Sequence, residues 1–199
     1  MSGTSRLARR VRPRAVPAGI EVSTGKRVTT TAVALLVLAA IAAAAAIPSA
    51  RDGLYFANLA LAGILLGKEV TTFLVITPAA RSLPVPAQVR MQQALMPPFR
   101  NLGPVVFNLV LVTGIALAAS VDAPGRYFEI AGSACIAAML VAVFKVSVPI
   151  NLWTAEQTVD VDPAVWAAQR RRWDGIQVVR LLLDAAALTC FLLALLTNT

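Results

Sequence analysis

The chain has 199 residues and a formal net charge of +8, with 58% hydrophobic and 14% charged residues. Soluble domains average about 45–50% apolar and about 25% charged residues, so this composition argues against a soluble domain and favours the bilayer. Histidine is absent. Because imidazole is the common protein ligand for haem, copper and zinc, any metal would need carboxylates, and we expect no metal. The two cysteines, Cys135 and Cys190, lie in apolar runs and predict no disulfide framework.

The chain begins with a basic leader, residues 1–27, that is rich in serine, glycine and proline. Its positive residues are Arg6, Arg9, Arg10, Arg12, Arg14, Lys26 and Arg27. Such a composition cannot bury a core, so we expect the leader to be disordered. A basic leader could bind nucleic acid, but beside a long apolar run it is more typical of the cytoplasmic flank of a membrane helix. We therefore expect no nucleic-acid partner.

Five apolar stretches follow, and each approaches the roughly 20 residues that a helix needs to cross the hydrocarbon core. They cover residues 28–47, 54–80, 103–121, 130–150 and 176–196. Backbone groups in lipid must bond within their own segment, so the prediction is an all-α integral membrane helical bundle. We expect a four-helix core at 54–196, inside a domain 50–199, and one extra N-terminal transmembrane helix at 28–49. Residues 48–50 faintly resemble a signal-peptidase site, but the leader is long for a signal peptide, which favours a retained helix.

Arginine and lysine set the predicted orientation. With the N-terminus inside, the inner segments hold the leader and Arg81, Arg90, Arg100, Arg170, Arg171 and Arg172. The outer segments hold only Arg51 and Arg126. This positive-inside bias predicts a multi-pass protein of the cell membrane, with a cytoplasmic N-terminus and an external C-terminus.

The two inner connections carry helix signals of their own. Residues 87–96 alternate apolar with polar side chains before Pro97 and Pro98, which predicts a short interfacial helix that ends before the prolines. Asp162 and Pro163 predict a helix start, with the aspartate as the N-cap. Trp166 and the arginines at 170–172 then follow, a pattern typical of a belt at the lipid headgroups.

Five ionisable residues fall inside the predicted core spans, where each costs about 2.5–3.5 kcal/mol on insertion scales. They are Lys68, Glu69, Lys145, Arg180 and Asp184. The helical rise of about 1.5 Å per residue puts all of them between the midplane and the cytoplasmic surface. Polar side chains at similar depth are Thr71, Thr72, Asn108 and Asn151. Opposite charges in one layer can simply neutralise one another, but with these neighbours we favour a polar cavity that opens towards the inner leaflet or the cytoplasm.

Helical geometry adds three more specific predictions. Arg180 and Asp184 are four residues apart, so they share a helical face and can pair directly. Lys68 and Glu69 are adjacent, so their side chains diverge by about 100° and cannot both point at one spot. A GxxxG pattern at 63–67 predicts the close approach of another helix beside the charged pair.

Four stretches of the core carry a family resemblance. They read TPAARSLP at 77–84, MQQA at 91–94, VPIN at 148–151 and WAAQRRRWDGIQVVR at 166–180. Through them the segment 54–196 resembles the DUF1772 family, also called the anthrone oxygenase-like family. The family pattern has four membrane helices, so a helix before residue 54 would be an addition.

The resemblance implies an oxidoreductase of aromatic polyketide biosynthesis, a cofactor-independent monooxygenase that acts on an anthrone-like or other easily oxidised phenolic substrate with O2. It also transfers Asn151, Trp173 and Arg180 as site residues. An anthrone is a weak carbon acid, so such an enzyme needs a base, a cation beside the enolate and a dry pocket. We expect the base to be Glu69, with Lys145 or Arg180 at the oxyanion.

The complete candidate site follows from these roles. The expected catalytic residues are Glu69, Arg180 and Asn151, and the expected substrate-binding residues are Lys68, Lys145, Trp173, Asp184 and Asn108. Many members of the family have no assigned role, so whether the chain is an enzyme stays open. The alternative is a non-catalytic membrane protein that binds a small molecule or lipid and assists export or partner assembly. Homo-oligomerisation is also left open.

Overall fold

The computed structural model describes residues 38–39, 41–43 and 46–198, and everything below concerns these residues. The chain divides into two compact units, Met1–Leu36 and Val37–Thr199, and the first unit lies outside the described residues. The predicted leader 1–27 and most of the predicted helix 28–49 therefore also lie outside them. The extra N-terminal transmembrane helix gains no support from the structure.

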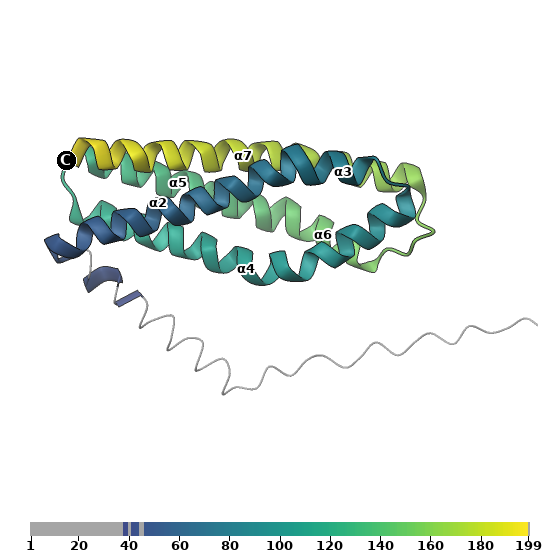
Figure 1. The fold of residues 1–199 in the computed structure, drawn as a ribbon, viewed down its shortest axis with the longest axis horizontal. Helices are drawn as coiled ribbons and strands as arrows, with labels where there is room; N and C mark the ends of the chain where they lie inside the picture. The colour runs from purple at the N-terminus through teal and green to yellow at the C-terminus, as the bar shows by residue number, and fades with distance from the viewer. Residues whose placement is uncertain (1–37, 40, 44–45, 199) are drawn as a thin grey trace, which may run out of the picture. The chain divides into compact units, whose positions relative to one another are not determined.

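The described part of the chain is helical and contains no strand (Figure 1). Its elements are α2 (Pro48–Thr71), η1 (Thr72–Ile76), α3 (Thr77–Arg81), α4 (Val85–Ser120), α5 (Gly125–Ala142), η2 (Val143–Ser147), α6 (Val148–Glu156) and α7 (Pro163–Asn198). Four helical stretches within it are long and apolar enough to cross a membrane: Ser49–Arg81, Leu102–Ser120, Gly125–Glu156 and Pro163–Asn198. The prediction of a multi-pass membrane protein is confirmed, whereas the direction of insertion remains a prediction.

The helices form an up-down-up-down bundle (Figure 1). α2 packs against α4 and α7, and α5 packs against the same two helices, so α2 and α5 face each other diagonally. We call the end where α2 begins, α4 meets α5 and α7 finishes the terminal end. The opposite end, with the connections 82–84 and 157–162, is the loop end. Every connection is short, as expected between antiparallel neighbours in a bundle.

The interior of the bundle is built from stripes of residues spaced alternately three and four apart. On α2 the stripe contains Tyr55, Asn58, Ala62, Leu65 and Glu69, and it continues to Thr72 at the start of η1. On α7 they are Gln177, Arg180, Asp184, Ala187, Phe191 and Ala194. This spacing keeps side chains on one face of a helix, so each stripe faces the bundle axis over several turns. Polar side chains in the stripes are thereby forced into the interior.

Apolar side chains in these stripes form two clusters. One lies near the terminal end and contains Leu54, Tyr55, Leu117, Val121 and Ala194. The larger one lies in the middle of the bundle and contains Ala62, Leu65, Val106, Phe107, Val110, Ile136, Met139, Ala187 and Phe191. Meanwhile many large apolar side chains on the outer faces of the helices are exposed, including Phe56, Ile64 and Phe144. That exposure is what a lipid-facing surface requires.

The first and third long helices share one irregularity, a π-helical segment just before a proline. Thr77 donates its N–H to the carbonyl of Thr72, and Val148 donates to Val143, so both bonds skip one residue more than in an α-helix. Pro78 and Pro149 follow directly, and a proline cannot supply the next N–H. The widened turn accommodates the missing donor, so each helix continues through its proline.

Two predictions about the loop-end segments have different outcomes. The short interfacial helix that should end before Pro97 is wrong, because α4 runs unbroken from Val85 to Ser120. Tertiary packing against the neighbouring helices outweighs the local effect of the prolines. The helix start at Asp162 is confirmed: its Oδ1 accepts a hydrogen bond of 2.7 Å from the N–H of Ala164, and α7 begins at Pro163.

Candidate functional site

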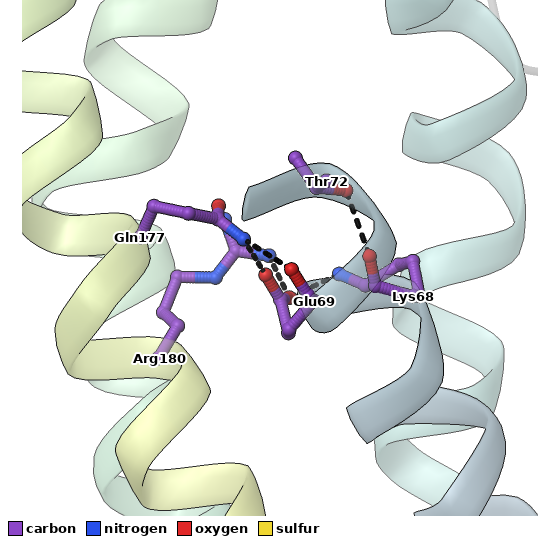
Figure 2. A network of polar contacts seen from close by, with 5 residues as sticks. All are labelled: Lys68, Glu69, Thr72, Gln177 and Arg180. Atoms are coloured by element: carbon purple, nitrogen blue, oxygen red, sulfur yellow. Dashed lines mark hydrogen bonds and ion pairs between the residues drawn. The ribbon is translucent and has the colours of Figure 1, made fainter. Parts of the chain in front are cut away.

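The centre of the candidate site is the carboxylate of Glu69, which is 0% exposed in the loop-end half of the bundle. Figure 2 shows three donors converging on it: the ammonium of Lys68, the amide Nε2 of Gln177 and the guanidinium Nη2 of Arg180. Gln177 and Arg180 come from the inward stripe of α7, which packs against α2. A buried carboxylate held by two cations and an amide is a compensated charge, which the low-dielectric interior requires.

Lys68 reaches Glu69 although the two residues are neighbours in sequence. The prediction that their side chains could not meet at one spot is wrong, because the flexible lysine chain bends back towards the carboxylate. Its ammonium also lies 5.2 Å from the centre of the Phe107 ring, a cation–π distance. The hydroxyl of Thr72 donates 2.8 Å to the backbone carbonyl of Lys68.

Asp184 lies one turn beyond Arg180 on α7 and is 1% exposed. The predicted direct pair between these two residues is wrong, because the guanidinium of Arg180 turns to Glu69 on the neighbouring helix. Both carboxylate oxygens of Asp184 are left without a hydrogen-bond partner among the described residues. Asp184 nevertheless lies within electrostatic range of Lys68, Glu69 and Arg180. The loop-end half therefore holds one saturated carboxylate beside one open carboxylate.

The structure does not bring the remaining predicted site residues into this network. Lys145 and Asn108 are both exposed on the outside of the bundle. Asn108 donates 2.7 Å to the carbonyl of Pro104 in its own helix. Asn151 and Trp173 are half-buried, and neither forms a hydrogen bond with the network around Glu69. The depth predicted along each helix does not determine whether a side chain faces the bundle axis.

The GxxxG pattern is not a helix-packing face. A Cβ added at Gly63 or Gly67 would meet nothing within 4 Å, so the prediction of a close helix approach there is wrong. Close approaches occur at other glycines. A Cβ at Gly132 would lie 2.6 Å from Cε1 of Phe191, and one at Gly125 would overlap the side chain of Asn198. These glycines let α5 and α7 pack tightly.

At the loop end, tryptophan and arginine join α4, α6 and α7. Trp166 is only 1% exposed, so the prediction that it faces the headgroups is wrong. Its indole N–H donates 2.8 Å to Oε1 of Gln88, and its ring lies 5.8 Å from that of Trp153. Arg170 lies over the ring of Trp173 at 4.5 Å. A hollow of about 370 Å³ opens beside them, lined by Arg81, Val85, Gln88, Pro163, Trp166, Ala167, Arg170, Arg171 and Asp174.

A second buried polar cluster lies between the two apolar clusters, and the sequence reading missed it. Its members are Asn58 on α2, Thr113 on α4, and Glu129 and Ser133 on α5, all buried. The hydroxyl of Thr113 and Oδ1 of Asn58 are 2.8 Å apart. Glu129 was overlooked because the predicted span began at residue 130, whereas α5 begins at Gly125. We call these four residues the outer polar cluster, after the side on which the predicted orientation would place it.

Comparison with known proteins adds no relative: no family model matches the chain, and no curated protein or solved structure is significantly similar to it. The likeness to the anthrone oxygenase-like family thus rests on the four sequence stretches alone. Among the described residues, no group of three or more histidine, cysteine or acidic side chains could hold a metal ion.

Proposed function

We propose that this protein is a membrane-embedded, cofactor-independent oxygenase that acts on an easily oxidised phenolic small molecule of the anthrone type. One observation carries the proposal: Asp184 is a buried carboxylate with two unpartnered oxygens, one helical turn from the cation Arg180. A base beside a cation, away from water, is the combination that ionising a weak carbon acid needs. In this proposal Asp184 replaces Glu69 as the base.

The reason for preferring Asp184 is the hydrogen bonding of the two carboxylates. Glu69 already accepts bonds from Lys68, Gln177 and Arg180, so its oxygens are occupied and its ionised form is stabilised. Asp184 has free lone pairs to receive a proton. Glu69 then acts as a positioning residue, because it fixes the guanidinium that would stabilise the enolate oxygen.

The overall reaction balances without a cofactor. Asp184 takes a proton from the activated C–H of the substrate, and the resulting enolate is stabilised by Arg180. The carbanion passes electrons to O2 and a C–O bond forms, giving a hydroperoxide once it is protonated. Loss of water then breaks the O–O bond and leaves a carbonyl, so one substrate and one O2 give one quinone and one water.

The test is oxygen consumption by the purified protein in lipid nanodiscs with a panel of anthrones and related phenols. We expect one O2 consumed per quinone formed, with at least a hundredfold slower turnover in Asp184→Asn, the usual size of a general-base contribution. Lys145→Gln is the matched control, since that side chain is exposed and should leave the rate unchanged. No turnover of any substrate by folded protein, or full activity in Asp184→Asn, would refute the proposal.

One observation favours the non-catalytic alternative, a small-molecule or lipid binder. The charges around Glu69 compensate one another, and the two hollows described by volume lie elsewhere. One is the loop-end hollow beside Trp166, and the other, of about 350 Å³, is lined by Ala42, Ala46, Arg51, Ala116, Ala119 and Ser120. The same nanodisc sample separates the two functions: saturable binding of an anthrone without O2 consumption identifies a binder.

A further inference from the structure

The outer polar cluster has a closed geometry of its own. Asn58 and Thr113 are joined directly, at 2.8 Å. Gly114, the next residue along α4, lies against α5, since a Cβ added there would be 2.6 Å from Oγ of Ser133. Glu129 precedes Ser133 by one helical turn, so the two side chains share a face of α5. Three helices therefore bring these four polar side chains together near the bundle axis.

Donors and acceptors in this cluster are unsatisfied in a complementary way. Both carboxylate oxygens of Glu129 lack a partner among the described residues, as do Nδ2 of Asn58 and Oγ of Ser133. Glu129 and Asn58 are each 0% exposed. Unmet donors beside unmet acceptors match what one water molecule offers, since water can accept two hydrogen bonds and donate two.

Charge makes a further demand on Glu129. No lysine or arginine in the described part of the chain lies within 4.0 Å of its carboxylate. An isolated carboxylate in a membrane interior is costly and must be neutralised. Glu69 lies on α2 about 16 Å from Asn58 towards the loop end, by the helical rise. Its charge is compensated by Lys68 and Arg180. Among the described residues Glu129 has no such pair, so binding a proton is the way its charge is neutralised there.

We propose that the outer polar cluster is a proton-binding site, in which Glu129 binds and releases a proton and one trapped water links it to Asn58 and Ser133. In the ionised state the water donates to the carboxylate and accepts from the amide and the hydroxyl. In the protonated state the carboxyl O–H donates to the same water, and the hydroxyl of Ser133 rotates to accept a hydrogen bond from it, so the water still accepts only two. A proton fits better than a larger cation, because the unmet Nδ2 of Asn58 is a donor and would repel one.

The surroundings of Glu129 give the proton a way in from the terminal end. Tyr55 on α2 and Cys190 on α7 lie within electrostatic range of Glu129. Cys190 is also in range of Cys135 on α5, and Arg126, near the start of α5, pairs with Asp122 just before that helix. The described part of α4 contributes only uncharged Thr113 to this cluster. Tyr55 lies within electrostatic range of both Glu129 and Arg51. Arg51 in turn lines the hollow of about 350 Å³, which lies beside the terminal end.

This inference does not depend on the proposed oxygenase, and its test needs no substrate. Infrared difference spectra of the protein in lipid nanodiscs, recorded between acidic and alkaline buffer, report the carbonyl stretch of protonated carboxylic acids. We expect a high-frequency band, separate from that of exposed carboxyls such as Glu156, that appears on acidification, moves when glutamate carboxyls carry ¹³C, and is absent in Glu129→Gln. Glu69→Gln is the matched control, because its carboxylate is saturated, and it should keep the band.

Two further measurements keep the proposal falsifiable if Glu129→Gln does not fold. Ser133→Ala removes one partner of the water, so it should shift the frequency of the band without abolishing it. Adding Na⁺ at constant pH, with choline as the comparison ion, should leave the band unchanged. Displacement of the band by Na⁺ would show a sodium site instead. A glutamate band that is absent, or that does not respond to pH while the protein stays folded, would overturn the proposal.

Discussion

The ion pair between Glu69 and Arg180 permits a quantitative test of how the bundle tolerates charge. The change is Arg180→Met, which keeps the length of the side chain but removes the guanidinium from a position that is 8% exposed. Breaking a buried pair from one side costs about 3–5 kcal/mol, because the remaining charge stays buried. We expect about 3 kcal/mol, at the lower end, since Lys68 and Gln177 still donate to the carboxylate.

The assay is a double-mutant cycle measured by thermal unfolding in detergent. A loss of 3 kcal/mol should lower Tm by about 6–12 °C in a protein of this size. Adding Glu69→Gln to Arg180→Met removes the stranded charge, so the double variant should regain at least half of the loss. If the double variant loses as much as the sum of the two single variants, the side chains do not interact and the argument for a compensated network fails.

Four substitutions test two glycine positions, the cap of α7 and a surface ion pair; amide exchange reports on the cap, and unfolding reports on the others. Gly63→Ala should raise the free energy of unfolding by about 0.5–1 kcal/mol, because its Cβ meets nothing within 4 Å, whereas Gly132→Ala should lower it by about 1–3 kcal/mol through overlap with Phe191; equal effects would contradict the glycine assignment. Asp162→Ala removes the cap of α7 and should cost about 1 kcal/mol, seen as faster amide exchange confined to its first turn. Arg81→Ala breaks an exposed ion pair and should cost no more than about 1 kcal/mol; a larger loss would mean that the pair is structural.

The spans and the heptad spacing could be predicted from the sequence because both are local properties. Apolar runs of sufficient length located all four described membrane helices. The spacing of Gln177, Arg180 and Asp184 already places them on one face of a helix. The same reasoning separates Lys145 from the interior. Lys145 lies on the side of its helix opposite to the buried positions Met139 and Ser147.

The partners of these side chains could not be predicted, because partner choice depends on tertiary packing. Arg180 could pair with Asp184 on its own helix or with Glu69 across the interface, and only the position of α2 decides between them. Depth counted along one helix also carries no information about register between helices. The direct contact between Asn58 and Thr113, which are far apart in sequence, is therefore a finding of the structure.

The π-helical segments change which side chains face the bundle interior on either side of them. From Thr72 to Ala80 the inward positions of the first long helix are eight residues apart, and the same interval separates Met139 from Ser147 in the third, where seven would continue the stripe. The one extra residue in each π-helical segment thus rotates the turns that follow it relative to the turns before it. Insertion or deletion of one residue inside η1 would rotate the turns on its loop-end side, including α3, by about 100° and leave Glu69, which precedes the segment, in place. In the first and third long helices the π-segments therefore set the rotation of the loop-end turns relative to the rest of the bundle.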